Sequence, residues 1–159
     1  MVEIKKNKGK VISINYSKTK GTPKIPIEKG LLIKDYGLDN DAHAGSDSLK
    51  QVSLLAIESI KKQITCAKIK TDELKPGDFA ENITTKGIDL SNLKIGDKLR
   101  IGNQSIIEIS KIGKECHKYC SIYYKIGDCI MPKEGVFAKV LVEGKITVGD
   151  DIEVIEDVC

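Results

Sequence analysis

The fold is decided by a stretch that occurs twice in the chain, as Leu93-Lys-Ile-Gly-Asp-Lys-Leu-Arg-Ile101 and as Ile146-Thr-Val-Gly-Asp-Asp-Ile-Glu-Val154. In each copy a Gly-Asp pair is followed by residues that alternate between apolar and polar. Gly and Asp favour a tight turn, and the alternation has the two-residue period of a half-buried strand. Each copy therefore predicts a chain reversal that leads into a strand. We interpret them as two similar strand starts and not as a repeat of domains.

Working outward from these two copies, short β-branched or apolar runs predict further strands at residues 12–16, 30–33, 104–112, 121–126 and 136–142. One stretch, residues 53–63, has helical spacing, with Leu54, Ile57 and Ile60 on one face and Ser53 as the N-cap. A shorter helix is expected near residues 72–74, and residues 18–28, with a glycine and two prolines, predict a long loop. Many short strands separated by Gly and Asp predict a mostly-β fold, a single β-barrel with one or two short inserted helices.

The composition agrees with this prediction. The chain has 159 residues, of which 40% are hydrophobic and 31% charged, as expected of one globular domain that spans residues 1–159. Aromatic residues make up only 4% and there is no Trp. The core is therefore expected to consist of Ile, Val and Leu, of which the β-branched ones suit strands.

Charge and hydropathy exclude two classes of partner. The formal net charge is only +3, and Arg100 is the sole arginine. A protein that read bases or clamped phosphates bidentately would use more arginines, so we expect no nucleic-acid binding. No apolar run reaches the roughly 20 residues that span a bilayer, and no apolar segment follows the charged first ten residues. We therefore expect a cytoplasmic protein that does not bind membranes.

The densest group of reactive side chains, here called the cysteine cluster, comprises Lys114, Cys116, His117, Lys118, Cys120, Asp128 and Cys129. An odd number of cysteines in a chain of this size favours reduced thiols over a disulfide framework. Three interpretations stay open. The neighbouring lysines and histidine favour a nucleophilic thiolate. Three cysteines and a histidine could instead hold zinc, although adjacent Cys116 and His117 do not fit the usual ligand spacing. Each cysteine could also be a small buried apolar residue.

Two other segments contain grouped polar residues. Gly37-Leu-Asp-Asn-Asp41-Ala-His43-Ala-Gly45 is a glycine-bounded loop with two carboxylates and a histidine. By itself it is consistent with a solvated acidic turn. In Pro76-Gly-Asp-Phe-Ala-Glu81-Asn82-Ile83, the Glu-Asn pair is consistent with a turn capped by the Asn side chain. Neither segment alone predicts a function.

Taken in chain order, these segments resemble the MOSC family, named after the C-terminal domain of molybdenum cofactor sulfurases, over residues 11–155. The segments that carry the resemblance are Val11-Ile-Ser-Ile-Asn with residues 17–24, Gly37 to Gly45, Gln51-Val-Ser-Leu-Leu, Gly77-Asp-Phe-Ala-Glu-Asn-Ile, Gly135-Val-Phe-Ala-Lys-Val and Val148-Gly-Asp-Asp-Ile-Glu-Val. The small stand-alone bacterial members are the most similar, through Cys-His-x-x-Cys, Gly-Asp-Cys-x-Met-Pro and Glu-Gly-Val-Phe-Ala elements. Lys50, Lys114 and Lys133 stand where relatives often have arginine. Lysine keeps the charge but loses the planar fork that grips phosphate.

The resemblance implies a β-barrel and an essential cysteine that carries sulfur as a persulfide or binds molybdenum. The residue that corresponds best to the molybdenum ligand is Cys120, with Cys116 as the alternative. For a persulfide carrier, thiol chemistry further suggests catalytic roles for Cys129, which would resolve a persulfide as a mixed disulfide, and for His117 or Asp128, which would move protons. Residues expected to bind the molybdenum cofactor are Asp41, His43, Lys50, Glu81, Asn82 and Lys114.

The function that follows from the resemblance is an accessory role in molybdenum cofactor metabolism. Expected partners are cofactor-biosynthesis proteins or molybdoenzymes, with a cysteine desulfurase as sulfur donor. Pyridoxal phosphate is not expected to bind the domain directly. The resemblance leaves open whether the protein is an enzyme on its own. The alternative is a non-catalytic binding module in which the cysteine cluster holds a structural zinc ion.

Overall fold

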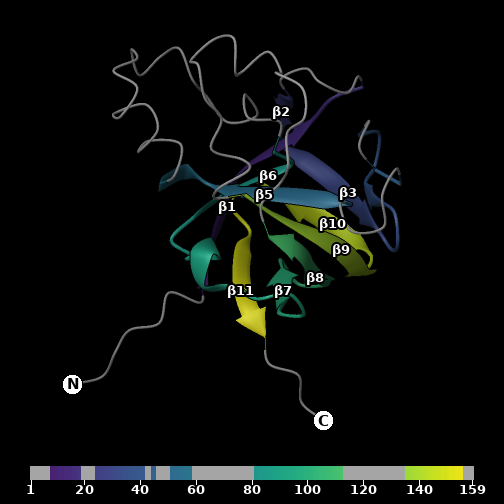
Figure 1. Cartoon of the computed structure of the whole chain (residues 1–159). Coiled ribbons are helices and arrows are strands. Elements are labelled where there is room, and N and C mark those ends of the chain that lie inside the picture. Colours follow the sequence, from purple (N-terminus) through teal and green to yellow (C-terminus); the bar gives the residue numbers. More distant parts are fainter. Residues whose placement is uncertain are drawn as a thin grey trace, which may run out of the picture.

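The computed structural model describes residues 8–18, 24–41, 44–45, 51–58, 81–112 and 135–155. Their strands are β1 (Lys8–Tyr16), β2 (Ile25–Ile27), β3 (Lys29–Ile33), β4 (Gly37–Leu38), β5 (Val52–Ala56), β6 (Ile83–Lys86), β7 (Lys98–Ile101), β8 (Ser105–Ile112), β9 (Val136–Val142), β10 (Gly144–Thr147) and β11 (Asp151–Ile155). A short 3-10 helix, η1, covers Leu90–Asn92. The predicted mostly-β architecture is confirmed (Figure 1).

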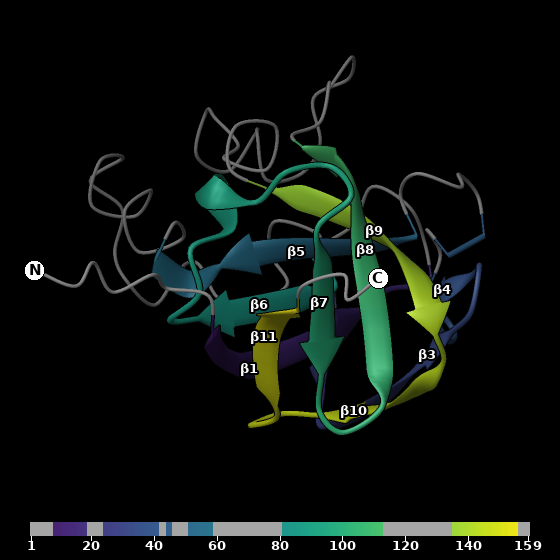
Figure 2. The ribbon, with the colours of Figure 1, turned by 90° about the horizontal axis from the view of Figure 1, so that it is seen from below.

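The described strands form a closed barrel with a small additional sheet. The large sheet has the order β11-β7-β8-β9-β5-β6-β1-β2, and antiparallel pairing of β1 with β11 closes seven of these strands into a ring (Figure 2). The second sheet has the order β10-β3-β4. β5 and β6 run parallel, whereas β1 runs antiparallel to β6. Consequently the end of β1 and the starts of β5 and β6 lie at the same side of the sheet.

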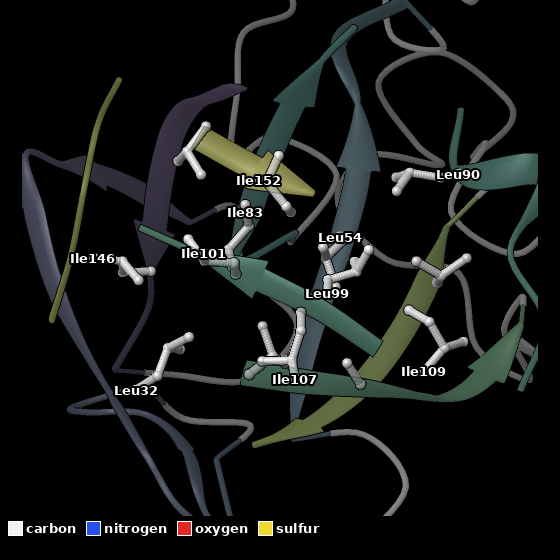
Figure 3. Close-up of a cluster of buried hydrophobic side chains, with 14 of the residues drawn as sticks. Leu32, Leu54, Ile83, Leu90, Leu99, Ile101, Ile107, Ile109, Ile146 and Ile152 are labelled. Carbon is white, nitrogen blue, oxygen red and sulfur yellow. The ribbon is translucent and has the colours of Figure 1, made fainter. Parts of the chain in front are cut away.

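The barrel interior is filled by aliphatic side chains that alternate along the strands. Leu99 and Ile101 of β7 and Ile107 and Ile109 of the neighbouring strand β8 are fully buried and face the interior side by side (Figure 3). The core cluster contains Ile, Val, Leu and Ala, as the composition predicts. Burial of such side chains is the main favourable term for folding, at about 1.5–3 kcal/mol for each large aliphatic residue.

The repeated stretch forms two equivalent turns, each of which leads into a strand as predicted. In the first, Asp97 Oδ2 accepts from the Lys94 amide at 2.9 Å; in the second, Asp150 Oδ2 accepts from the Thr147 amide at 2.8 Å. The glycine before each aspartate has a positive φ, +100° and +97°. The two strands that follow, β7 and β11, pair with each other in the barrel.

The helix predicted at residues 53–63 is wrong at its start, because residues 53–56 belong to β5. Helical backbone begins only at Ile57 and Glu58, and residues 59–63 lie outside the described residues. All of β5 is buried, since it lies between β6 and β9. A short apolar run buried on both faces has no visible two-residue period, so periodicity cannot separate strand from helix there.

Three further predictions concern the loop at residues 18–28, the helix near residues 72–74 and the strand at residues 121–126. The predicted loop at residues 18–28 contains β2, a three-residue edge strand with Pro26 at its centre, where proline is tolerated. The helix expected near residues 72–74 and the strand expected at residues 121–126 lie outside the described residues. In the part of the chain that the structure describes, no helix has the length and apolar character needed to cross a membrane.

One buried hydroxyl in β6 predicts a mutational contrast. Among the described residues, Thr85 Oγ1 is buried without a hydrogen-bond partner, whereas the neighbouring Thr84 hydroxyl binds Asn15 Nδ2 and Glu81 Oε2. Thr85→Val is therefore expected to leave the free energy of unfolding unchanged or to raise it by about 1 kcal/mol. The isosteric control Thr84→Val should lower it by about 1–3 kcal/mol, because it removes the buried hydrogen bonds to Asn15 Nδ2 and Glu81 Oε2. Urea denaturation measures both, and equal losses would contradict the assignment.

Candidate functional site

Buried polar side chains are concentrated where β1 ends and β5 and β6 begin. They are Ser13, Asn15, Ser17, Lys24, Asp41, Gln51, Ser53, Glu81, Asn82 and Thr84. Polar side chains are normally solvated, and charged ones are almost never fully buried unless they are paired. Ser13, Ser53 and Thr84 are each next to a core residue of the same strand, so they point away from the barrel interior. This network is therefore a buried polar layer on the outside of the barrel wall.

Asn82, directly before β6, joins three strands. Its Oδ1 accepts from the Ser53 amide at 3.0 Å and from the Ser53 hydroxyl at 3.2 Å. Its Nδ2 donates to the Asn15 carbonyl at 3.2 Å. Its backbone amide donates to the Ser53 hydroxyl at 2.9 Å, and its carbonyl accepts from the Asn15 amide at 2.7 Å. Asn82 is thus a cross-strand clamp between β1 and β5, which is more than the turn cap that the sequence alone suggests.

Glu81 begins a chain of side-chain hydrogen bonds along the same wall. Its Oε2 accepts from the Thr84 hydroxyl at 2.8 Å, and Thr84 Oγ1 accepts from Asn15 Nδ2 at 3.1 Å. Asn15 Oδ1 in turn accepts from the Ser13 hydroxyl at 2.6 Å. Each of these side chains is at most 5% exposed, so the bonds replace water that the groups have lost. Glu81 therefore fixes the orientation of an entire polar row.

Asp41 forms a buried ion pair with Lys24. Lys24 Nζ lies 2.6 Å from Asp41 Oδ1, and the two side chains are 1% and 0% exposed. The same Oδ1 accepts from the backbone amide of Ser17, directly after β1, at 3.0 Å. A buried ion pair gains little net stability because both charges lose their hydration. Its evident effect is to fix the geometry of the segments that it joins.

The described residues near Asp41 are held by backbone hydrogen bonds and by two glycines in special conformations. The Asp41 amide donates to the Leu38 carbonyl, and the Ala44 amide donates to the Asp41 carbonyl. Gly37 and Gly45 have positive φ angles of +127° and +72°. A Cβ at Gly45 would lie 2.8 Å from the Tyr36 ring, so the loop closes against that ring. Asp41 thus belongs to a defined turn and not to a solvated acidic loop.

The two described groups of candidate residues share one end of β1. Asn82 binds the Asn15 carbonyl, and Asp41 binds the Ser17 amide two residues further along. Asp41, Glu81 and Asn82 are therefore brought together around a single strand end. The remaining predicted site residues lie outside the described residues: His43, Lys50, Lys114, Cys116, His117, Cys120 and Cys129.

The residues that flank the cysteine cluster are aligned with this region. Ile112, the last residue of β8, pairs with Val136 of β9, and Val136 pairs with Leu54 of β5. Leu54 pairs in turn with Ile83, the first residue of β6. Residues 113–134, which carry the cluster, are thus flanked by two residues in register with the start of β6.

Three residues of the network are not predicted as site residues from the sequence. Lys24 is one of 26 Lys and Arg residues and lies in a segment that predicts a solvated loop. Asn15 and Ser53 occupy outward positions of strands, where polar residues normally face water. Their burial follows from contacts between segments far apart in the chain, and no local pattern carries that information.

A second group of polar residues lies elsewhere on the described part of the barrel. A shallow concavity of about 360 Å³ lies at the opposite end of β1 and is lined by Lys8, Arg100, Gly102, Asn103, Asp151 and Glu153. Both carboxylates that line it are in ion pairs, Asp151 with Lys10 at 2.8 Å and Glu153 with Arg100. The hydrogen bond from Lys10, together with its positive charge, holds the pKa of Asp151 below its usual value. Within the described ranges, no three Asp, Glu, His or Cys side chains are grouped in a way that suits a metal ion.

Comparison with protein families decides the identity of the domain. The family model described as the MOSC domain matches residues 39–153, which is more than half of the chain. The chain belongs to the MOSC domain family. The matched range of this MOSC domain includes Asp41, Glu81, Asn82 and the cysteine cluster.

Solved structures agree on the fold. The YuaD protein from Bacillus subtilis is 17% identical, with a TM-score of 0.72 over 92% of this MOSC domain and 95% of that chain. YiiM from Escherichia coli is 21% identical, with a TM-score of 0.67 over 94% of this chain and 71% of that one. YiiM from Geobacillus stearothermophilus is 20% identical, with a TM-score of 0.70 over 93% and 75%. At these identities the likeness shows the fold alone. A search of curated proteins finds no significant match.

Proposed function

We propose that this MOSC domain is a cytoplasmic accessory protein of molybdenum cofactor metabolism that carries sulfur on a cysteine persulfide. The observation that supports the proposal is the family match, which covers in one range the cysteine cluster and the described candidate residues Asp41, Glu81 and Asn82. Soft thiolates suit both sulfur and molybdenum chemistry. Cys120 is the proposed sulfur carrier, with Cys116 as its alternative.

The transfer step needs no external oxidant. The carrier thiolate attacks the terminal sulfur of a persulfide on a cysteine desulfurase, the S–S bond of the donor breaks, and the donor cysteine leaves as a thiolate. Sulfur is thereby moved with its oxidation state unchanged. The proposed acceptor is the molybdenum cofactor on a biosynthesis protein or a molybdoenzyme.

The described residues do not fit direct contact with the cofactor. The Asn82 side chain donates to Asn15 and accepts from Ser53, Asp41 is paired with Lys24, and Glu81 accepts from Thr84. Two of the three candidates are carboxylates, which repel a pterin phosphate. We therefore assign Asp41, Glu81 and Asn82 to positioning, and none of the three is proposed to contact the cofactor. Contact with an anionic ligand is left to His43, Lys50 and Lys114.

Mass spectrometry after incubation with a cysteine desulfurase and cysteine tests the proposal. We expect the protein to gain one sulfur atom on Cys120 or Cys116, in a form that dithiothreitol removes. The gain should disappear in one of Cys120→Ser and Cys116→Ser. It should persist in Cys66→Ser and Cys159→Ser, which are the matched controls. Absence of added sulfur under every loading condition would contradict the carrier function.

The same samples distinguish the zinc alternative. Metal analysis of protein purified without chelator is expected to find no stoichiometric zinc. One equivalent of zinc, lost together with the fold when Cys116 and Cys120 are replaced by serine, would identify a structural metal site and displace the proposal.

A further inference from the structure

Asp41 forms hydrogen bonds with four described residues. Its carboxylate binds the Ser17 amide after β1 and the Lys24 ammonium before β2. Its backbone amide binds Leu38 at the end of β4, and its carbonyl binds the amide of Ala44. These contacts connect residues that are 17 and 24 positions from Asp41 along the chain. No other described ion pair is comparably buried: the pairs Lys10–Asp151, Arg100–Glu153 and Lys139–Glu108 all keep exposed side chains.

The energetics of this pair argue against a role in stability alone. Removing two charges from water costs several kcal/mol for each ion, and apolar replacement of a buried pair is often neutral or stabilising. A pair that contributed only to stability could be replaced on both sides by aliphatic residues at little cost. The advantage of an ion pair is directional: a charge-assisted hydrogen bond of 2.6 Å fixes one oxygen of Asp41, which also receives the Ser17 amide.

We propose that Lys24 and Asp41 are positioning residues of the site, which set the two backbone hydrogen bonds of Asp41 with Leu38 and Ala44, here called the turn, against the end of β1. The inference rests on the proposed function, because the candidate ligand His43 lies in the sequence between Asp41 and Ala44. Lys24 acts through Asp41, since its ammonium holds the carboxylate that organises the turn. Loss of the pair therefore releases the turn while the barrel, whose core lies on the other face of the wall, persists.

Two measurements on Lys24→Met and on the charge-free double variant Lys24→Met/Asp41→Leu test the proposal. Hydrogen exchange of the Ala44 amide, which donates to the Asp41 carbonyl, should accelerate roughly tenfold or more in both variants. Exchange of the Ile109 amide, which donates to Asp97 on another part of the barrel, should stay unchanged. The rate of sulfur loading should fall roughly tenfold, as expected when a reacting group is displaced by about 1 Å. Lys24→Arg, which keeps the charge, should restore part of both signals.

The double variant separates positioning from stability. It leaves no unpaired charge, so it should regain stability relative to Lys24→Met and yet keep the fast Ala44 exchange and the slow loading. The matched control is Lys10→Met, which removes the exposed pair with Asp151 at a similar N–O distance of 2.8 Å and should change neither readout.

Three outcomes would overturn the proposal. One is a folded double variant with wild-type Ala44 exchange and wild-type loading. Another is Lys10→Met producing the same changes as Lys24→Met. The third is loss of the fold in every Lys24 and Asp41 variant, since the pair would then determine folding and not the turn. If the wild-type protein takes up no sulfur, the proposed function fails on its own, and the amide exchange still decides the role of the pair.

Discussion

Gly37→Ala is expected to lower the free energy of unfolding by at least about 3 kcal/mol, a large share of the 5–15 kcal/mol typical of a domain. Two costs add at this position. Gly37 has φ +127°, which residues with a side chain rarely adopt, at a cost of about 1–3 kcal/mol. A Cβ there would also lie 2.3 Å from the Gln51 carbonyl oxygen. Overpacking of this kind costs about 1–3 kcal/mol more.

Gln51 cannot move aside to relieve the clash. It is 4% exposed, and its side-chain Oε1 accepts from the Val140 amide of β9 at 2.9 Å. Movement of the Gln51 backbone would break that bond and displace the start of β5. The strain should therefore open the contact between Gly37 and Gln51, directly before β5.

Gly96→Ala is the matched control for this prediction. Gly96 also has a positive φ, +100°, but a Cβ there would meet nothing within 4 Å. Gly96→Ala should therefore lower the free energy of unfolding only by the conformational cost, about 1–2 kcal/mol. Chemical denaturation of both variants measures the difference. Equal losses would mean that the close approach between Gly37 and Gln51 does not exist in solution.

The sequence correctly predicts strands that follow a recognisable turn. Its predictions are wrong where the structure depends on contacts between residues far apart in the chain. The turns before β7 and β11 were predictable because Gly and Asp act within four residues, as the Lys94–Asp97 hydrogen bond shows. The start of β5 was not, because a strand buried on both faces resembles a buried helix in composition. Tertiary pairing with β6 and β9, and not local propensity, decides its structure.

The same distinction between local and long-range information applies to the residues of the candidate site. A resemblance of ordered segments was sufficient to identify Asp41, Glu81 and Asn82 as residues of interest. It did not reveal that they act on protein groups, because their partners lie far away in sequence: Lys24 is 17 residues from Asp41, and Ser53 is 29 residues from Asn82. A buried polar residue must bind protein groups in place of water, so it is less available to a ligand. Whether it is buried depends on the whole fold and cannot be read from the local sequence.

Asn82→Ala tests this framework and is expected to lower the free energy of unfolding by about 3 kcal/mol. The change removes the acceptor of the Ser53 amide and the donor to the Asn15 carbonyl. Each buried backbone group left without a partner costs about 1–3 kcal/mol. Asn92→Ala is the matched control, because Asn92 is exposed and its side-chain amide donates to the Asp89 carboxylate at 2.8 Å near the surface. A surface change of that kind should stay within about 0.5 kcal/mol.

Asn82→Asp separates the two hydrogen bonds of the clamp. A carboxylate still accepts from the Ser53 amide, but at neutral pH it presents a charged oxygen to the Asn15 carbonyl in place of a donor. Protonation at acid pH restores a donor, so the loss of stability relative to wild type should be large at pH 7 and shrink as the pH falls. Parallel urea titrations of both proteins at several pH values measure this. A loss that is the same at every pH, or an Asn82→Ala variant as stable as Asn92→Ala, would show that Asn82 does not join β1 to β5.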